Sequence, residues 1–250
     1  MDIIALERSH TTGVMPQRDL AIVRGDGAVL WDDRGNEYID CMSGHGVAII
    51  GHNNPDVAAA LCEQAQCLIS LSGSLYNDKR AAAMEKLTSI APAGLDRVFL
   101  SNSGAEAIEA AIKFARMATG KPGIIATMRG FHGRTMGALS ATWEKKYRQP
   151  FEPLVPGFSH VTYDSLDKMR DAVNDSTAAI VIEIVQGEGG VRPASAAYLQ
   201  GLQALCEERG VLLIVDEVQT GFGRTGKMFA CEHYDLTPDI LCLGKGIAGG

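Results

Sequence analysis

The chain has 250 residues, of which 46% are hydrophobic and 21% are charged, and its formal net charge is −7. Its length and composition are typical of a globular protein with a large core, and the acidic balance without a basic cluster excludes nucleic acid as an expected partner. The apolar runs are far shorter than the roughly 20 residues that cross a bilayer, and residues 1–4 lack the charged start of a signal peptide. We therefore expect a cytoplasmic protein that has no membrane partner.

The first fifty residues predict a small antiparallel sheet. Short strand-like segments at residues 21–24, 28–31 and 37–40 are separated by glycine-containing turns, which is the pattern of a three-stranded meander. We assign residues 1–50 to the N-terminal part of a small α+β domain.

From residue 51 onward the pattern changes to helices and then to alternating strands and helices. We expect helices at about residues 55–70, 79–91, 105–118 and 195–209, and strands at residues 98–100, 123–127, 178–182, 211–215 and 240–243. Alternation of this kind predicts an α/β fold whose mostly parallel sheet is flanked by helices on both faces. We assign residues 51–250 to this large domain.

The segment that joins the strand at 98–100 to an alanine-rich helix is a candidate anion site. Ser103 and Glu106 have the spacing of a capping box. Gly104 would let a phosphate approach the main chain, and the free N–H groups and dipole of a helix start favour an anion. The alternative is a helix that is merely well capped. Farther along this helix, Glu109 and Lys113 are spaced as an exposed ion pair.

A glycine-bordered turn after the strand at 123–127 carries an aromatic and a cationic residue. Phe131 could stack on a planar ring, and Arg134 could bind a carboxylate through bidentate hydrogen bonds. Phe131 could equally be a core residue. His132 lies between them, and we interpret it as a structural hydrogen-bonding residue that takes no part in the chemistry.

Two strand ends in the last part of the chain carry a carboxylate and an amine. Asp216 follows the strand at 211–215, and Lys245 follows the strand at 240–243. Both can reach the crevice in which open α/β sheets bind ligands. The pairing suits pyridoxal phosphate, whose aldehyde condenses with a lysine and whose ring nitrogen must keep a proton. An ion pair at about 4 Å is worth on the order of 4 kcal/mol at an effective dielectric near 20, so Asp216 could hold that proton at neutral pH.

Two glycine motifs point weakly to nucleotides. Residues 221–228 match a P-loop except that Met228 replaces the Ser or Thr that binds magnesium, which argues against a nucleotidase. Residues 244–249 match G-x-G-x-x-G, but the following helix and the acidic ribose ligand cannot be checked. The six cysteines include no Cys-x-x-Cys pair, so we expect reduced thiols and no metal site.

Seven segments together resemble one family, the class III branch of the fold-type-I pyridoxal-phosphate aminotransferases. They follow the family's order and cover nearly the whole chain. The segments are residues 35–40, 51–55, 102–107, 131–135, 185–190 and 216–221, and Lys245. Within the family the chain most resembles the acetylornithine-type members, and residues 128–148 favour those that act in lysine biosynthesis.

The resemblance implies the roles of the cofactor-binding residues. Lys245 would bond to the cofactor aldehyde and then act as catalytic base and acid, and Asp216 would pair with the pyridine nitrogen. The other cofactor-binding residues that it implies are Ser103, Gly104 and Ala105 at the phosphate, Phe131 and Val218 on the two ring faces, and Gln219 near the ring hydroxyl.

The resemblance also implies a substrate site and a reaction. Arg134 would bind a substrate carboxylate, and Glu188 would pair with a later arginine and release it when glutamate or 2-oxoglutarate binds. The reaction would be ping-pong transfer of a terminal amino group from N-acetylornithine, or from acetylated or carrier-linked lysine, to 2-oxoglutarate in arginine or lysine biosynthesis. The alternatives are a 4-aminobutyrate or other ω-amino acid aminotransferase, and an inactive fragment of such an enzyme.

Members of this family continue well beyond the lysine. The resemblance therefore implies that the large domain is incomplete at its C-terminus, and that the 250-residue chain may be inactive alone. It further implies that the full-length protein is a homodimer.

Overall fold

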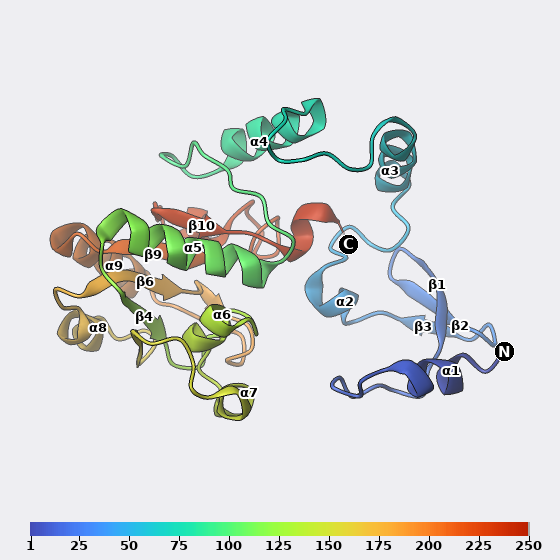
Figure 1. Ribbon diagram of the computed structural model, residues 1–250, viewed down its shortest axis with the longest axis horizontal. Helices are drawn as coiled ribbons and strands as arrows, with labels where there is room; N and C mark the ends of the chain where they lie inside the picture. Colours follow the sequence, from blue (N-terminus) through green and yellow to red (C-terminus); the bar gives the residue numbers. More distant parts are fainter. Residues whose placement is uncertain (250) are drawn as a thin grey trace. The chain divides into compact units, whose positions relative to one another are not determined.

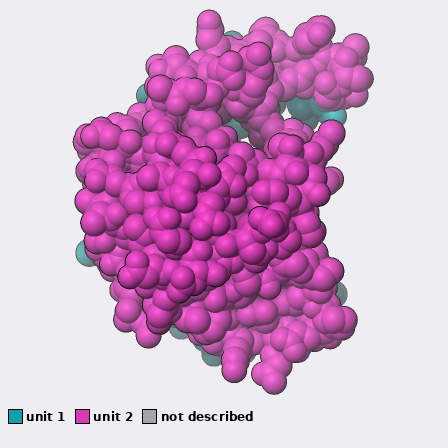
Figure 2. Space-filling view, turned by 90° about the vertical axis from the view of Figure 1, so that its left-hand side faces the viewer, with its two compact units in different colours: residues 1–71, 248–250 teal, residues 72–247 magenta. Residues whose placement is uncertain are grey.

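The computed structural model describes residues 1–249, which form two compact units. Unit 1 comprises residues 1–71 together with the end of the chain from Ala248, and unit 2 comprises residues 72–247. Figure 2 shows the two units in different colours. The predicted division at residue 50 concerns the domains of the whole enzyme, and it stays a prediction.

The predicted meander is present in unit 1 (Figure 1). Its strands pair antiparallel in chain order and are β1 (Ile22–Asp26), β2 (Val29–Asp32) and β3 (Glu37–Ile39). Asp32 fixes the turn between β2 and β3, because its Oδ1 accepts hydrogen bonds from the backbone N–H groups of Arg34 and Asn36 at 3.0 and 2.8 Å. Hydrogen bonding, above all from the Asn36 side chain, lowers the pKa of Asp32 to about 2.

The helices predicted at about 55–70 and 79–91 are confirmed, and each begins at an asparagine. The helices of unit 1 are α1 (Ile3–His10), α2 (Ser43–Gly46) and α3 (Pro55–Cys67), and the first helix of unit 2 is α4 (Asp78–Ile90). Oδ1 of Asn54 accepts hydrogen bonds from the N–H groups of Asp56 and Val57 at the start of α3. Oδ1 of Asn77 accepts one from Arg80 at the start of α4. Capping of this kind satisfies N–H groups that have no partner within a helix.

A five-stranded sheet forms the centre of unit 2, and all its strands are parallel. The strands are β4 (Gly123–Thr127), β5 (Phe158–Val161), β6 (Thr177–Ile182), β9 (Leu212–Asp216) and β10 (Ile240–Cys242). They lie in the order β10-β9-β6-β4-β5. Only β5 was not predicted, because its sequence Phe-Ser-His-Val has no continuous apolar run.

Helices cover both faces of this sheet, and the predicted α/β fold class is confirmed. The covering helices are α5 (Gly104–Thr119), α8 (Leu166–Ala172) and α9 (Ala196–Arg209). Neighbouring residues of β6 point to opposite faces. Ile180 belongs to a buried cluster with Met169 of α8 and Leu199 of α9, whereas Val181 belongs to a second cluster with Ile108 of α5. All six residues of β6 are buried, as expected of a strand with cores on both sides.

The remaining elements of unit 2 are short. They are helices α6 (Met136–Ala141) and α7 (Lys145–Arg148), strands β7 (Val185–Gln186) and β8 (Arg192–Pro193), and the 3₁₀ helices η1 (Gln149–Phe151), η2 (Ala230–His233) and η3 (Lys245–Ala248). Strands β7 and β8 form an antiparallel hairpin. Among residues 1–249, none of the helices has the length and apolar character needed to cross a membrane.

The strand predicted at residues 98–100 is absent. The segment has no regular structure, and Phe99 and Leu100 are exposed. The ring of Phe99 packs edge-on against Phe114 of α5, with 5.3 Å between the ring centroids. The prediction was wrong because a strand also requires a neighbour to pair with, and the described residues place none beside this segment.

Candidate active site

The candidate site lies at the carboxyl edge of the parallel sheet in unit 2. From β4 the chain adds β5 on one side and then crosses to add β6 on the other, so the direction of winding reverses between β4 and β6. Ligands of open α/β sheets bind at such a reversal. Four segments leave the sheet at this edge, and they carry His132 after β4, Glu183 after β6, Asp216 at the end of β9 and Lys245 after β10.

Asp216 is buried at the end of β9 and is held by two hydrogen bonds. Its Oδ2 lies 2.8 Å from Nδ1 of His132, and its Oδ1 accepts the backbone N–H of Val218 at 3.0 Å. Its side chain is only 5% exposed. The parallel register places Asp216 beside Cys242 of β10, three residues before Lys245. Asp216 is thus a fixed carboxylate close to the strand that delivers the lysine.

His132 is fully buried and belongs to the site, although sequence reasoning interpreted it as structural and left it out of the chemistry. Burial alone would lower the pKa of this imidazole, but the hydrogen bond and charge of Asp216 outweigh burial and raise it. Its backbone N–H donates to Oγ1 of Thr142 at 2.9 Å. Its Nε2 is buried without a hydrogen-bond partner among the described residues. His132 therefore holds Oδ2 of Asp216 in a fixed position.

Lys245 faces the same space as Asp216. Burial lowers the pKa of its amine, and the nearby charges of Asp216, Glu183 and Glu188 act in the opposite direction. Its Nζ donates a hydrogen bond to Oε1 of Gln219. The backbone of Lys245 has φ = 41°, a left-handed conformation that is unusual for a long side chain and recurs at functional sites. A partly desolvated amine with a lowered pKa is suited to act as a nucleophile.

Glycines allow close packing around the start of α5. A Cβ on Gly104 would lie 2.7 Å from Cγ1 of Val218, and one on Gly133 would lie 2.8 Å from Cβ of Ala105. A Cβ on Gly244 would lie 3.1 Å from Val218 and 3.5 Å from Cα of Gly104. These contacts bring the start of α5, the loop after β4, the end of β9 and the end of β10 together. A side chain at these glycines would collide with the predicted cofactor-binding residues.

The start of α5 is capped by Ser103 as the sequence predicts. Its Oγ accepts the N–H of Glu106 at 3.2 Å, and the Glu106 carboxylate accepts the N–H of Asn102 at 2.7 Å. The N–H groups of Gly104 and Ala105 have no acceptor among residues 1–249, as is normal in a first helical turn. They are available to an anion.

An aromatic and cationic stack lies on the loop after β4. The ring of Phe131 packs edge-on against Tyr147, with 5.9 Å between the centroids, and the guanidinium of Arg134 lies 4.5 Å from the centroid of the same Tyr147 ring. Arg134 is exposed and Phe131 is half-buried. Sequence reasoning did not assign a role to Tyr147. Tyr147 lies on a short helix 13 residues after Arg134, and no sequence pattern near it indicates this contact.

Glu109 positions the same loop and is not the member of an exposed ion pair that the sequence predicts. Its Oε1 accepts hydrogen bonds from Oγ1 of Thr135 at 2.6 Å and from the N–H groups of Gly137 and Ala138 at 2.7 and 3.1 Å. These three donors form the start of α6. The carboxylate therefore ties α6, and the loop before it, to α5.

Glu188 lies at the exposed tip of the β7–β8 hairpin. Gln186, at the base of this hairpin, is buried and donates its side-chain amide to Oγ1 of Thr127 at 3.1 Å and to the carbonyl oxygen of Met128 at 2.9 Å. The hairpin is thus attached to the end of β4. Its attachment keeps the charge of Glu188 within electrostatic range of Lys245.

Glu183 is the buried acidic residue that sequence reasoning missed. It follows the fully buried strand β6 directly, just as Asp216 ends the apolar strand β9. The sequence therefore contained the signal, which is a carboxylate at a strand end next to the reversal of winding. Without the strand order, that reversal could not be located.

The residues present fit pyridoxal phosphate. The amine of Lys245 can reach an aldehyde, the buried carboxylate of Asp216 can hold a ring proton, and the N–H groups of Gly104 and Ala105 can receive a phosphate. In contrast, residues 221–228 form turns that lead into the four-residue helix η2, so the P-loop match lacks its α-helix. The described side chains include no cluster of His, Cys, Asp and Glu that could hold a metal ion.

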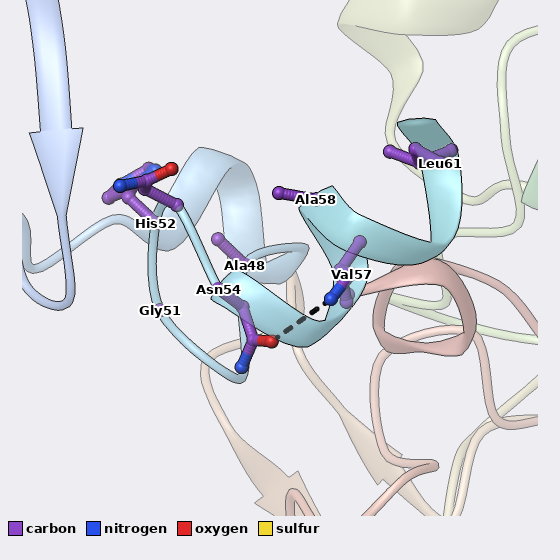
Figure 3. Close-up of a pocket in the computed structure, with 9 residues that line it drawn as sticks. Ala48, Gly51, His52, Asn54, Val57, Ala58 and Leu61 are labelled. Carbon is purple, nitrogen blue, oxygen red and sulfur yellow. Dashed lines mark hydrogen bonds between the residues drawn. The ribbon is translucent and has the colours of Figure 1, made fainter. Parts of the chain in front are cut away.

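A separate surface pocket lies in unit 1 (Figure 3). Its lining consists of Ala48, Gly51, His52, Asn53, Asn54, Val57, Ala58, Leu61 and Gly249. Figure 3 shows Asn54 bonded to Val57 at the start of α3, so this polar lining residue already serves as a helix cap. None of the residues that gather at the sheet edge lines this pocket.

Comparison with known proteins identifies relatives that match nearly the whole chain. The family model for class-III aminotransferases matches residues 12–250. A [LysW]-aminoadipate semialdehyde transaminase from Deinococcus radiodurans is 53% identical over 99% of this chain and 58% of its own length. An acetylornithine aminotransferase from Methanopyrus kandleri is 52% identical over 92% of this chain and 59% of its own. The chain thus spans about three fifths of the length of these two relatives.

A solved structure shares the fold. The taurine:2-oxoglutarate aminotransferase from Bifidobacterium kashiwanohense, determined in complex with PLP and glutamate, superimposes with a TM-score of 0.92 at 32% identity. The match covers 98% of this chain and 61% of that one. The predicted family and the predicted fold are therefore both confirmed.

Proposed function

This chain belongs to the class-III aminotransferases, and we propose that it forms the cofactor site of an enzyme that moves a terminal amino group with the help of pyridoxal phosphate. The observation that carries the proposal is the location of Asp216 at the end of β9 and of Lys245 just after the neighbouring strand β10, at one edge of a parallel sheet, where the charge of Asp216 acts on the amine. Asp216 is buried and oriented by His132, and the amine of Lys245 has a lowered pKa.

When bound, the cofactor supplies an electron-withdrawing ring that stabilises negative charge on the substrate carbon. Asp216 keeps a proton on the ring nitrogen, because its carboxylate is fixed by His132 and by the N–H of Val218. The amine of Lys245 binds the cofactor and moves a proton at the substrate carbon as general base and acid. Gln219 holds that amine through the hydrogen bond to Nζ.

The remaining predicted residues bind and orient the other groups. The N–H groups of Gly104 and Ala105, at the helix start that Ser103 caps, receive the phosphate. Phe131 and Val218 contact the two faces of the ring. The close approaches at the glycines of the site, which bring Gly104, Ala105 and Val218 together, support the roles of these three residues.

We further propose the substrates of the full-length enzyme. The donor is N-acetylornithine or an acetylated or carrier-linked lysine, and the acceptor is 2-oxoglutarate, in a ping-pong reaction of arginine or lysine biosynthesis. The names of the two closely related sequences support the donor. Arg134, which is exposed beside Phe131, binds a substrate carboxylate, and Glu188 gates the site for the second substrate.

A homodimer in the cytoplasm belongs to the same proposal. The exposed rings of Phe99 and Phe114, together with exposed Met117, give unit 2 an apolar surface on α5 and the segment before it. Such a surface suits contact with a second subunit. The cysteines of the described chain are all free thiols, which fits a reducing compartment.

Substitution of Lys245 tests the proposed function. In the full-length enzyme, we expect Lys245→Ala to abolish the covalent cofactor–protein adduct that borohydride traps, because the reacting amine is gone. Mass spectrometry of the reduced, digested protein measures the adduct. Lys113→Ala, which removes an exposed lysine of α5, is the control and should leave the adduct in place. An adduct that persists in Lys245→Ala at full yield would place the reacting amine elsewhere.

Coupled assays test the donor. Formation of glutamate from 2-oxoglutarate is measured with N-acetylornithine, carrier-linked lysine and 4-aminobutyrate as alternative donors. We expect kcat/KM to be highest for one of the first two. A preference for 4-aminobutyrate would replace the proposed substrate while leaving the cofactor chemistry intact.

A further inference from the structure

Glu183 is a buried carboxyl group with no role in the proposed chemistry. It follows β6 directly and is 5% exposed. It lies at the reversal of winding, between the ends of β4 and β9 in the sheet order. A carboxyl group this deeply buried costs free energy unless its surroundings compensate for the lost water.

Its hydrogen bonds join two loops of the site. Oε2 of Glu183 accepts the backbone N–H of Phe131 at 3.0 Å, and Oε1 accepts the N–H of Gly187 at 3.5 Å. Phe131 belongs to the loop after β4, and Gly187 precedes Glu188 in the β7–β8 hairpin. One side chain therefore contacts both the segment that carries the ring-stacking residue and the segment that carries the gating residue.

Charged and titratable groups face Glu183 from the ends of the other four strands of the sheet. They are His132 after β4, Asp216 on β9, Lys245 after β10 and Tyr163 after β5. The hydroxyl of Tyr163 donates to the backbone carbonyl oxygens of Glu183 and Ile184 at 3.0 and 2.8 Å, so it does not neutralise the carboxyl group. His132 and Lys245 are thus the cations that can respond to the charge of Glu183, and His132 is the one that is hydrogen-bonded to Asp216.

We propose that Glu183 is a positioning residue whose charge controls the protonation of His132, and through it the hydrogen bond that orients Asp216. Two observations carry the proposal. His132 already uses Nδ1 for Asp216, and its Nε2 is buried with no acceptor among the described residues. A second proton on the His132 imidazole has no hydrogen-bond acceptor within residues 1–249, so its presence depends on negative charge nearby. Asp216 supplies part of that charge through its hydrogen bond, and Glu183 supplies a further part without bonding to the imidazole.

The sign of the coupling follows from the charges. When Glu183 is ionised, the imidazolium of His132 is balanced by two carboxylates, and when Glu183 is protonated it is balanced by Asp216 alone. Burial, partly offset by the charge of His132, raises the pKa of Glu183 to about 7. The coupling therefore operates near neutral pH, where an amino-transferring site must keep Asp216 ionised.

A charge-neutral substitution separates the charge of Glu183 from its hydrogen bond. In Glu183→Gln the amide oxygen can still accept the N–H of Phe131, but the negative charge is lost. We expect the imidazole of His132 to lose its proton at lower pH in this variant than in the wild type. The readout is the ¹⁵N chemical shift of the His132 ring, followed through a pH titration of the labelled full-length protein without cofactor.

A matched variant and a second measurement complete the test. Glu208→Gln removes an exposed carboxylate that pairs with Arg170, and it should leave the titration of His132 unchanged. In the wild type, the carboxyl ¹³C signal of Glu183 should show an inflection at the pH where the His132 ring responds. An unchanged His132 midpoint in folded Glu183→Gln overturns the proposal. If that variant does not fold, independent titrations of the two groups in the wild type overturn it.

The positioning role of Glu183 rests on the proposed function, but different experiments would contradict the role and the function. The titration needs neither cofactor nor turnover, so it reports the coupling even if the chain is inactive. Loss of the cofactor adduct in Lys245→Ala tests the function without reference to Glu183.

Discussion

Each compact unit holds a histidine bonded to an aspartate, and the N···O distances of the two pairs are almost the same. His52 Nε2 lies 2.7 Å from Oδ2 of Asp40 in unit 1, and His132 Nδ1 lies 2.8 Å from Oδ2 of Asp216 in unit 2. The surroundings differ, because the side chain of His52 is 28% exposed whereas that of His132 is 0% exposed. A histidine–aspartate hydrogen bond is therefore not in itself the mark of an active site.

The pair in unit 1 holds a backbone turn. Asp40 also accepts the N–H groups of Met42 and Ser43, at 2.9 and 2.8 Å. His52 and Gly27 exchange two backbone hydrogen bonds, which form an isolated bridge. The pair in unit 2 instead faces a second carboxyl group and a lysine. Burial among other charges is what distinguishes this pair and supports the catalytic role proposed for it.

The two units also differ in how their apolar side chains are covered. All six residues of β6 in unit 2 are buried, whereas none of the residues of α3 in unit 1 is. In unit 1, Ile39 is 78% exposed and Leu61 is 66% exposed. Most of the hydrophobic stabilisation therefore resides in unit 2.

The largest contrast is expected when each aspartate is replaced by asparagine. In the full-length enzyme, Asp216→Asn should lower kcat by about 100-fold or more, since a neutral amide cannot hold the ring proton as a carboxylate does. Asp40→Asn is the matched control, and its kcat should stay close to that of the wild type. Steady-state assays at saturating substrates measure both. Equal losses in the two variants would contradict the distinction between the pairs.

The next contrast concerns the cores. Ile180→Ala removes part of a fully buried side chain of β6, and we expect it to lower the free energy of unfolding by about 2–5 kcal/mol. Leu61→Ala removes a similar side chain from exposed α3 and should change it by less than about 0.5 kcal/mol. Urea denaturation is followed by the fluorescence of Trp143 for Ile180→Ala and of Trp31 for Leu61→Ala, each after replacement of the other tryptophan by phenylalanine. Comparable losses would mean that Leu61 is covered in solution.

Sequence patterns predicted the elements that have continuous apolar runs or clear caps. Strands β6, β9 and β10 and helices α3, α4, α5 and α9 were found for this reason. The segment at 98–100 has strand-like composition but lacks a neighbouring strand, and β5 has a neighbour but lacks the composition. Both cases depend on pairing between distant segments, which local patterns do not contain.

The candidate site could be predicted only in part for the same reason. Asp216 and Lys245 were found because each follows an apolar strand. Glu183 does so too, but its importance appears only when the strand order places it at the reversal of winding. His132 and Glu109 were interpreted from their local surroundings, whereas their partners lie 84 and 26–29 residues away.

The smallest expected effect is the one that Asp40→Asn has on unit 1. The hydrogen bond from His52, followed by those from Ser43 and Met42, lowers the pKa of Asp40. A lowered carboxyl pKa contributes stability that is fully present above the unfolded-state pKa of about 3.9 and is lost as pH falls through the lower folded-state pKa. Asparagine retains an oxygen acceptor but loses the charge, so the variant should be less stable than the wild type at pH 7 and should approach it in acid.

Amide hydrogen exchange at Gly27 and His52 measures this effect locally, because the two residues form the bridge that the pair supports. We expect faster exchange of both amides in Asp40→Asn than in the wild type at pH 7, with the difference shrinking at pH 3. Asp33→Asn removes an exposed carboxylate of the β2–β3 turn and should not alter their exchange. Unchanged protection in Asp40→Asn at pH 7 would show that the backbone bonds alone hold the turn. The contrast with the buried pair of unit 2 would then be sharper still, because only that pair would depend on its charge.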